Sequence, residues 1–141
     1  MKDLSILKPV FAQVALTFVL LFWMAKERLG AIRSGAVKVT DPGQRPIWSG
    51  RAGAVSNAFH NQLEMPMLFF VVVAFALITG AVDSTFVTLA WAYVAFRALQ
   101  AAIHGTYNYI PHRFLCYLAS SIVLIAMWVL LAMRVMPGAA G

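Results

Sequence analysis

Two sets of polar side chains with helical spacing interrupt an otherwise apolar sequence. The first set has the spacing i, i+3, i+4, i+7 and consists of Asn57, His60, Asn61 and Glu64. The second has the spacing i, i+3, i+7, i+10 and consists of Arg97, Gln100, His104 and Tyr107. Each spacing puts its residues on one face of a helix. Guanidinium, imidazole, phenol and amide groups gathered in this way can bind an anionic ligand or move a proton.

The rest of the chain is too apolar for a water-soluble domain. Of 141 residues, 62% are hydrophobic and 11% are charged, whereas soluble domains average about 45–50% apolar and about 25% charged residues. Four stretches approach the length of about 20 residues that crosses a bilayer. The sequence therefore predicts an all-α integral membrane protein of one domain, residues 1–141, with helices over about 7–28, 54–78, 85–107 and 114–134. A soluble bundle would need polar outer faces that these stretches lack.

Basic residues gather in the two connections at one end of the predicted bundle. The first connection carries Lys26, Arg28, Arg33, Lys38, Arg45 and Arg51, and the last carries Arg113. The positive-inside rule then places these connections in the cytoplasm and both termini outside. The net charge of +6 is explained by topology, and because the cations form no patch beside a nucleic-acid-binding motif, no nucleic acid is expected as a partner.

The two polar sets are expected to face each other. Counting outward from a tight turn near residue 82 brings His60 to the depth of His104 and Glu64 close to the depth of Arg97. Arg97 would lie about 15 Å inside its helix, where an unpaired charge is costly. Glu64 is its simplest partner, within one subunit or across an interface.

Two interpretations of these residues stay open. They can act as interhelical glue that fixes the bundle, or they can line a cavity for an anionic ligand at the cytoplasmic end. The cavity is favoured because more polar groups converge there than are needed to fix the alignment of the helices. They are Arg51, Asn57, His60, Asn61, Arg97, His104, Tyr107 and Arg113. No cluster has the spacing of metal ligands, so no metal is expected.

The four short helices, the basic first connection and the two polar sets resemble the MAPEG superfamily, the membrane-associated proteins of eicosanoid and glutathione metabolism. The most specific parts are Asn61-Xaa-Xaa-Glu64 and the interval from Arg97 to Arg113, and residues 57–66 resemble a bacterial branch. The resemblance implies a homotrimer in a membrane, here the inner membrane of a bacterium. It also implies glutathione bound between neighbouring subunits, and a lipophilic acceptor entering from the bilayer.

The resemblance also implies roles for particular residues. Asn61 and Glu64 match residues that hold polar groups of glutathione, and Arg97 matches the arginine that opens the second motif. Arg113 matches the arginine proposed to stabilise the thiolate, which is sensible because a nearby cation lowers a thiol pKa. Tyr107 or His104 would serve as the proton donor.

This chain departs from the glutathione-using pattern at three positions. It carries Asn57 where those members usually have arginine, His104 where they usually have tyrosine, and Gln100 where histidine is common. Arg51 is a nearby cation, one and a half turns before Asn57.

Two functions follow as expectations. The first is a transferase or peroxidase that uses glutathione or another thiol on lipophilic electrophiles. The alternative is a non-catalytic membrane protein whose polar cavity binds a lipid or another anionic ligand.

Overall fold

The computed structural model describes residues 3–38, 42–43 and 45–139. A short 3-10 turn, η1 (Leu4–Ile6), leads into four helices: α1 (Leu7–Arg33), α2 (Gly50–Thr79), α3 (Ser84–Gly105) and α4 (Ile110–Ala139). All four helices are long and apolar enough to cross a membrane, and the described residues contain no strand. The prediction of an all-α, multi-pass membrane bundle is confirmed.

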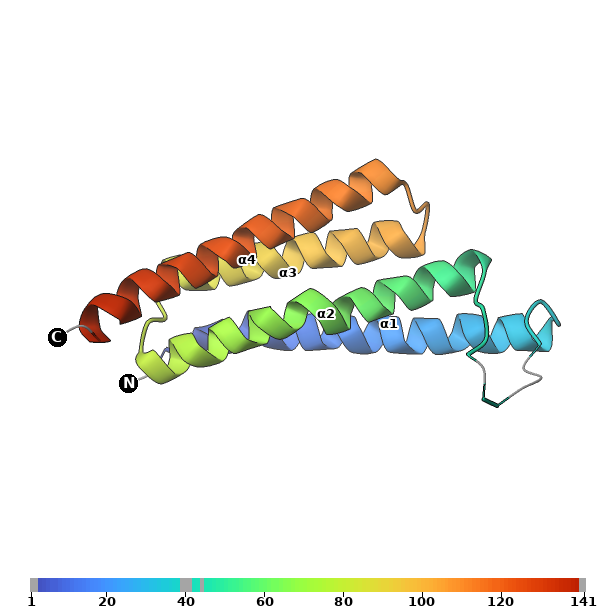
Figure 1. Ribbon diagram of the computed structural model, residues 1–141, viewed down its shortest axis with the longest axis horizontal. Coiled ribbons are helices and arrows are strands. Elements are labelled where there is room, and N and C mark those ends of the chain that lie inside the picture. Colours follow the sequence, from blue (N-terminus) through green and yellow to red (C-terminus); the bar gives the residue numbers. More distant parts are fainter. Residues whose placement is uncertain (1–2, 39–41, 44, 140–141) are drawn as a thin grey trace.

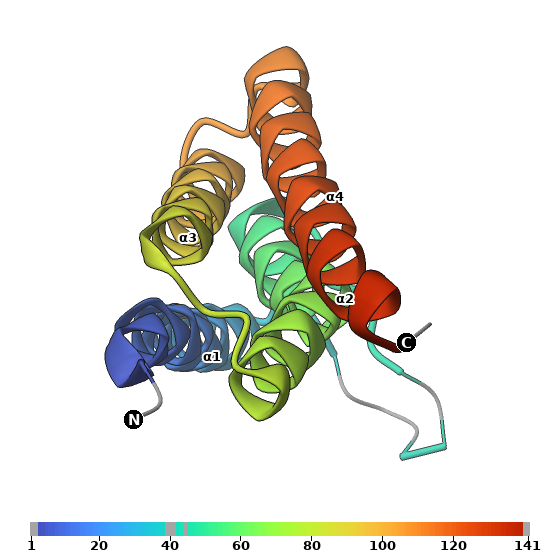
Figure 2. The ribbon, with the colours of Figure 1, turned by 90° about the vertical axis from the view of Figure 1, so that its left-hand side faces the viewer.

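The helices run alternately up and down, so the bundle has a terminal end and a loop end. Both termini lie at one end, and the α1–α2 and α3–α4 connections lie at the other (Figure 1). Viewed end-on, α1 lies beside α2 and α3 lies beside α4 (Figure 2). Helix α2 contacts all three other helices, so a residue on α2 can reach α1 on one side and the α3–α4 pair on the other.

Two helices at the loop end are longer than the sequence predicts. Helix α1 continues past residue 28 to Arg33, because Gly30 lies on an exposed face where it does not interrupt the helix. It stops just before Gly35, whose φ of +74° is a conformation that glycine adopts without strain. Helix α2 begins at Gly50, four residues before the predicted start. The polar set on α2 therefore lies within the helix rather than at its beginning.

The α3–α4 connection is shorter than predicted. Helix α3 ends at Gly105 instead of 107, and α4 begins at Ile110 instead of 114. Pro111 fits the first turn of α4 because a backbone N–H there has no partner within the helix. Within the connection between Gly105 and Ile110, Asn108 has a φ of +50°. This is a left-handed conformation that asparagine adopts more readily than most residues.

At the terminal end, one aspartate links α3 to α4. The Asp83 side chain accepts a hydrogen bond from Phe86 N (2.9 Å) and so caps α3, which follows the left-handed Gly80 that ends α2. Its other carboxylate oxygen pairs with Arg134 Nη2 of α4 at 2.7 Å. The hydrogen bond from Arg134, together with that from Phe86 N, holds the pKa of Asp83 below its usual value of 3.8.

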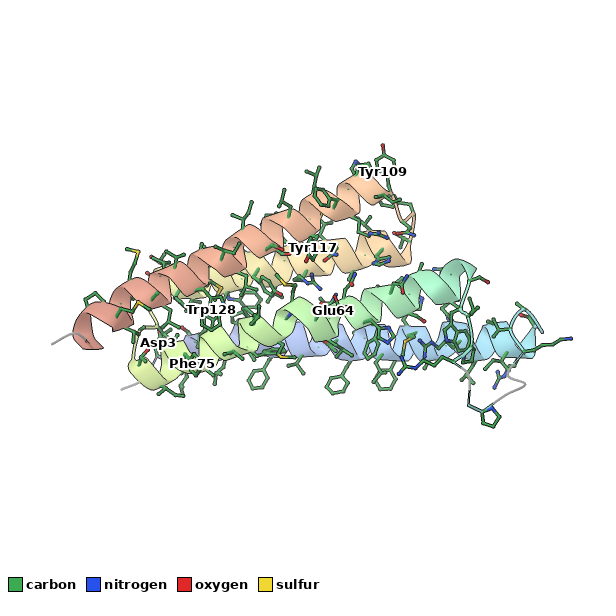
Figure 3. All side chains as sticks on the ribbon, in the orientation of Figure 1. Asp3, Glu64, Phe75, Tyr109, Tyr117 and Trp128 are labelled. Carbon is green, nitrogen blue, oxygen red and sulfur yellow. The ribbon has the colours of Figure 1, made fainter. Side chains whose placement is uncertain are left out.

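The main apolar core occupies the half of the bundle nearest the termini. Phe69 of α2 stacks on Tyr93 of α3 with ring centroids 4.6 Å apart, and Phe75 meets Trp128 of α4 edge-on at 6.2 Å. Figure 3 shows Phe75 and Trp128 at this end. Helix α2 continues through Pro66 without ending. This packing sets the register between α2 and α3, and so positions the polar residues closer to the loop end.

The outer surface of the bundle carries many large hydrophobic side chains. Large hydrophobic side chains are exposed on every helix, among them Phe11, Phe22, Phe75, Trp91 and Ile125. A surface of this kind suits lipid contact, since lipid tails are as apolar as the side chains themselves.

Candidate functional site

The polar residues of α2 line two separate pockets, one on each side of the helix. The first, here called the Arg28 pocket, has a volume of about 550 Å³ and is lined by Arg28, Arg45, Pro46, Trp48, Gly53, Ser56, Asn57 and His60. The second, the Arg113 pocket, has a volume of about 220 Å³ and is lined by Asn61, Gln100, Ile110, Arg113, Phe114 and Tyr117. The sequence predicts a single cavity, whereas in one chain the predicted residues are divided between two pockets.

The Arg28 pocket is formed by α1, α2 and the connection between them. The Nε atom of Arg28 donates a hydrogen bond to Ser56 Oγ at 2.9 Å, and its guanidinium lies 4.8 Å from the centre of the Trp48 ring. The Nδ1 atom of His60 is 2.7 Å from the Ser56 carbonyl oxygen. Because a carbonyl only accepts, Nδ1 carries the proton, and in the neutral ring Nε2 remains an acceptor.

The Arg113 pocket is formed by α2, α3 and the first turns of α4. Arg113 Nη1 donates to Asn108 Oδ1 at 2.7 Å, so the α3–α4 connection holds the guanidinium. Gln100 is buried, and its Oε1 atom has no hydrogen-bond partner among the described residues. Asn61 supplies an amide from α2. The pocket thus presents a cation and two amides, groups that suit a small anionic or peptide-like ligand.

The two polar sets meet as the depth argument predicts. Asn61 Nδ2 lies 3.4 Å from His104 Nδ1, so the amide donates to an imidazole nitrogen that must be unprotonated. His104 is only 4% exposed, and this contact turns it toward Asn61. In a single chain His104 is therefore placed to orient Asn61.

Within one chain, the ion pair expected between Glu64 and Arg97 does not form. Arg97 is completely buried about 12 Å from the end of α3, and its Nη2 donates to the backbone carbonyl of Asn61 at 2.5 Å. Glu64 is exposed on α2, at about the level of Tyr117 along the bundle (Figure 3). The two side chains therefore differ in burial, and no ion pair joins them.

Five predicted site residues line neither pocket in a single chain: Glu64, Arg97 and His104, described above, and Arg51 and Tyr107. Tyr107 is 61% exposed, and its hydroxyl is 3.2 Å from His112 Nδ1. The Arg51 Nε atom is 3.5 Å from Glu27 Oε1, and its guanidinium lies 5.7 Å from the centre of the Trp23 ring. Both side chains are at the loop end but are directed to other partners.

Several pocket residues were not among the predicted site residues. Tyr117 lines the Arg113 pocket, and its position four residues after Arg113 on one helix was a signal that the sequence did contain. Arg28 falls at the start of the first connection in the sequence prediction, because the predicted first helix ends at residue 28. Ser56 and Arg45 gave no signal, since their place depends on how the α1–α2 connection packs.

A buried amide pair links α1 and α2 deeper in the bundle. Gln13 Nε2 donates to Gln62 Oε1 at 3.0 Å, and both residues are buried. No group of three His, Cys, Asp or Glu residues within the described parts of the chain could hold a metal ion.

Comparison with known proteins gives one finding. The sequence model of the MAPEG family matches residues 6–133, which is nearly the whole chain. Neither the comparison with curated proteins nor the comparison with solved structures gives a match.

Proposed function

The chain belongs to the MAPEG family, and from this premise we propose that it is a membrane enzyme that uses glutathione or a related thiol. The reaction would be conjugation or reduction of a lipophilic electrophile. The observation that carries the proposal is the Arg113 pocket, in which a guanidinium held by Asn108 lies beside the amides of Asn61 and Gln100.

The pocket contains the groups that thiol chemistry requires. A free thiol has a pKa of about 8.5, and a nearby arginine lowers it toward neutral pH. Arg113 supplies that cation. The unpaired Oε1 of Gln100 can accept from an N–H of the peptide, and Asn61 can bind a carbonyl or carboxylate. Tyr117, which lines the same pocket, joins Tyr107 and His104 as a candidate proton donor.

A second copy of the chain is needed to complete this site. The volume of about 220 Å³ is below the roughly 300–1,000 Å³ of typical small-molecule pockets, so a tripeptide would protrude from it. Glu64 lies three residues after the pocket residue Asn61 and is exposed on a membrane-spanning helix, where a carboxylate facing lipid is costly. We propose a homotrimer in which a neighbouring subunit covers Glu64 and closes the pocket.

The acceptor would reach the thiol from the bilayer. Ile110 and Phe114 line the Arg113 pocket and are both exposed, so the rim of the pocket is apolar on the side of α4. A lipophilic electrophile can reach this rim without crossing water.

Calorimetry and an activity assay test the proposal together. The purified protein in detergent is titrated with glutathione and then assayed for conjugation of chlorodinitrobenzene. We expect binding in the micromolar to millimolar range, and loss of turnover in Arg113→Ala. The matched control is Lys8→Ala, since Lys8 is an exposed cation of α1 at the opposite end of the bundle. The absence of a heat of binding at millimolar glutathione would refute the proposal.

The subunit contact has its own test. If a neighbouring subunit covers Glu64, Glu64→Gln should weaken the trimer, because it leaves the partner's charge unpaired. Light scattering of the wild type and Glu64→Gln measures the mass directly. A monomeric wild-type protein would contradict the shared site.

A binding role without catalysis is the second candidate. It is favoured by Asn57, which lines the Arg28 pocket and is absent from the lining of the Arg113 pocket. The same assay separates the two candidates, because a protein whose cavity binds a lipid or another anionic ligand without catalysis gives no turnover with glutathione.

A further inference from the structure

We propose that the Arg28 pocket binds the phosphate of an anionic phospholipid from the leaflet at the loop end of the bundle. This site lies on the opposite side of α2 from the Arg113 pocket, and it does not rest on the proposed thiol chemistry.

The charge of the pocket favours an anion. Arg28 and Arg45 both line it, and no carboxylate does. Glu27, the acidic neighbour of Arg28, is engaged with Arg51 and with the indole N–H of Trp23. Two guanidinium groups around one space match the oxygens of a phosphate, which arginine binds in a bidentate manner.

Hydrogen-bonding groups complete the polar wall. One nitrogen of Arg28 is bound to Ser56, which fixes the guanidinium at the wall of the pocket. The ring of His60 is held through Nδ1, so Nε2 is left to accept a hydrogen bond from a hydroxyl group of the lipid headgroup. The Asn57 amide lies on the same wall and can donate to a phosphate ester or a glycerol oxygen.

The depth of the pocket matches the headgroup region. Helix α2 has 30 residues and is about 45 Å long, while the hydrocarbon core of a bilayer is about 30 Å thick. About ten residues of α2 must therefore extend beyond the core, and the polar residues place this excess at the Gly50 end. Ser56 and Asn57 then lie among lipid headgroups.

An indole ring gives the pocket a partly apolar wall. Trp48 lies against Arg28. Tryptophan is enriched at the membrane interface, where part of its ring contacts apolar groups and its N–H contacts water or polar groups. Pro46 extends this wall. A phospholipid has the matching chemistry, with an anionic phosphate next to glycerol and acyl carbons, whereas a small soluble anion has no apolar part.

Native mass spectrometry of the full-length protein tests the proposal. The protein in detergent is titrated with phosphatidylglycerol and, separately, with phosphatidylcholine of the same acyl chains. We expect phosphatidylglycerol to bind about tenfold more tightly than phosphatidylcholine. Arg28→Gln and Arg45→Gln should each weaken its binding about fivefold, because each removes one charge-assisted contact with the phosphate. Lys26→Gln is the matched control, because Lys26 is an exposed cation of α1 that does not line the pocket.

Four results would overturn the proposal. They are equal affinity for the two lipids, an equal loss in Lys26→Gln, displacement of the lipid by millimolar inorganic phosphate, and loss of lipid binding in Arg113→Ala. If Arg28→Gln fails to fold, Arg45→Gln still decides the question, since Arg45 lies in the connection and not in a helix. Failure of glutathione to bind would leave the lipid result unchanged, so the two proposals fail separately.

Discussion

Substitution of Gly105 by alanine should destabilise the bundle beside the candidate site. A Cβ atom built on Gly105 would lie 2.5 Å from Trp23 Cη2 and 2.6 Å from Cζ3, distances that real Cβ atoms do not reach. The indole cannot move freely, because its N–H donates to Glu27 Oε1 at 3.2 Å and Arg51 lies over the ring. Overpacking of this kind costs about 1–3 kcal/mol, and the better helix propensity of alanine returns at most about 1 kcal/mol.

The expected net loss of about 1–2 kcal/mol corresponds to a fall in melting temperature of roughly 5 °C for a chain of this size. Tryptophan fluorescence during heating in detergent measures it. Gly30→Ala is the control, because nothing lies within 4 Å of a Cβ at Gly30, and that variant should melt at or above the wild-type temperature.

A double-mutant cycle then identifies the cause. In a Trp23→Leu background, Gly105→Ala should lose its effect, because the ring that it meets is gone. The reasoning is refuted if Gly105→Ala and Gly30→Ala have the same melting temperature. It is also refuted if Gly105→Ala still lowers the melting temperature in the Trp23→Leu background.

Three further variants test other contacts. Gln62→Leu should cost about 1 kcal/mol by leaving the amide of Gln13 buried without its partner, and the double leucine variant should recover most of that loss in thermal melts. Asp83→Asn keeps the helix cap but loses the charge, so it should melt below the wild type at pH 7; because the native pKa of Asp83 is lowered, this gap should close as the pH falls below 3.8. Asn108→Gly keeps the left-handed backbone but releases Arg113, and should reduce kcat/KM for thiol conjugation about tenfold with little change in melting temperature; unchanged kinetics would show that Arg113 needs no support.

The sequence predicts most of the fold because the membrane imposes it. Long apolar stretches form helices in a bilayer, because a helix satisfies its own backbone hydrogen bonds. Counting residues from the turn of the antiparallel hairpin then predicts that Asn61 and His104 lie at the same depth, whatever the packing of the side chains. Helix ends were harder to predict. Gly30 and Pro111 are common helix terminators, yet one lies inside α1 and the other begins α4.

The site was predicted less completely, because its geometry depends on the rotation of each helix about its own axis. The spacing of polar residues does not tell which side of α2 faces which neighbouring helix, because polar residues occur on two sides of α2. For the same reason Glu64 could be matched to Arg97 in depth but not in direction. Arg28 and Ser56 lie together only because α1 continues beyond its predicted end.

The neighbours His60 and Asn61 line different pockets, and this restricts how the chain can change during evolution. Consecutive residues of an α-helix are about 100° apart around its axis, so inserting or deleting one residue between Ser56 and Glu64 would turn the following side chains from one pocket toward the other. Substitutions in this segment alter one pocket at a time, whereas a change of length disturbs both. The segment can therefore diverge in composition, but its length is constrained.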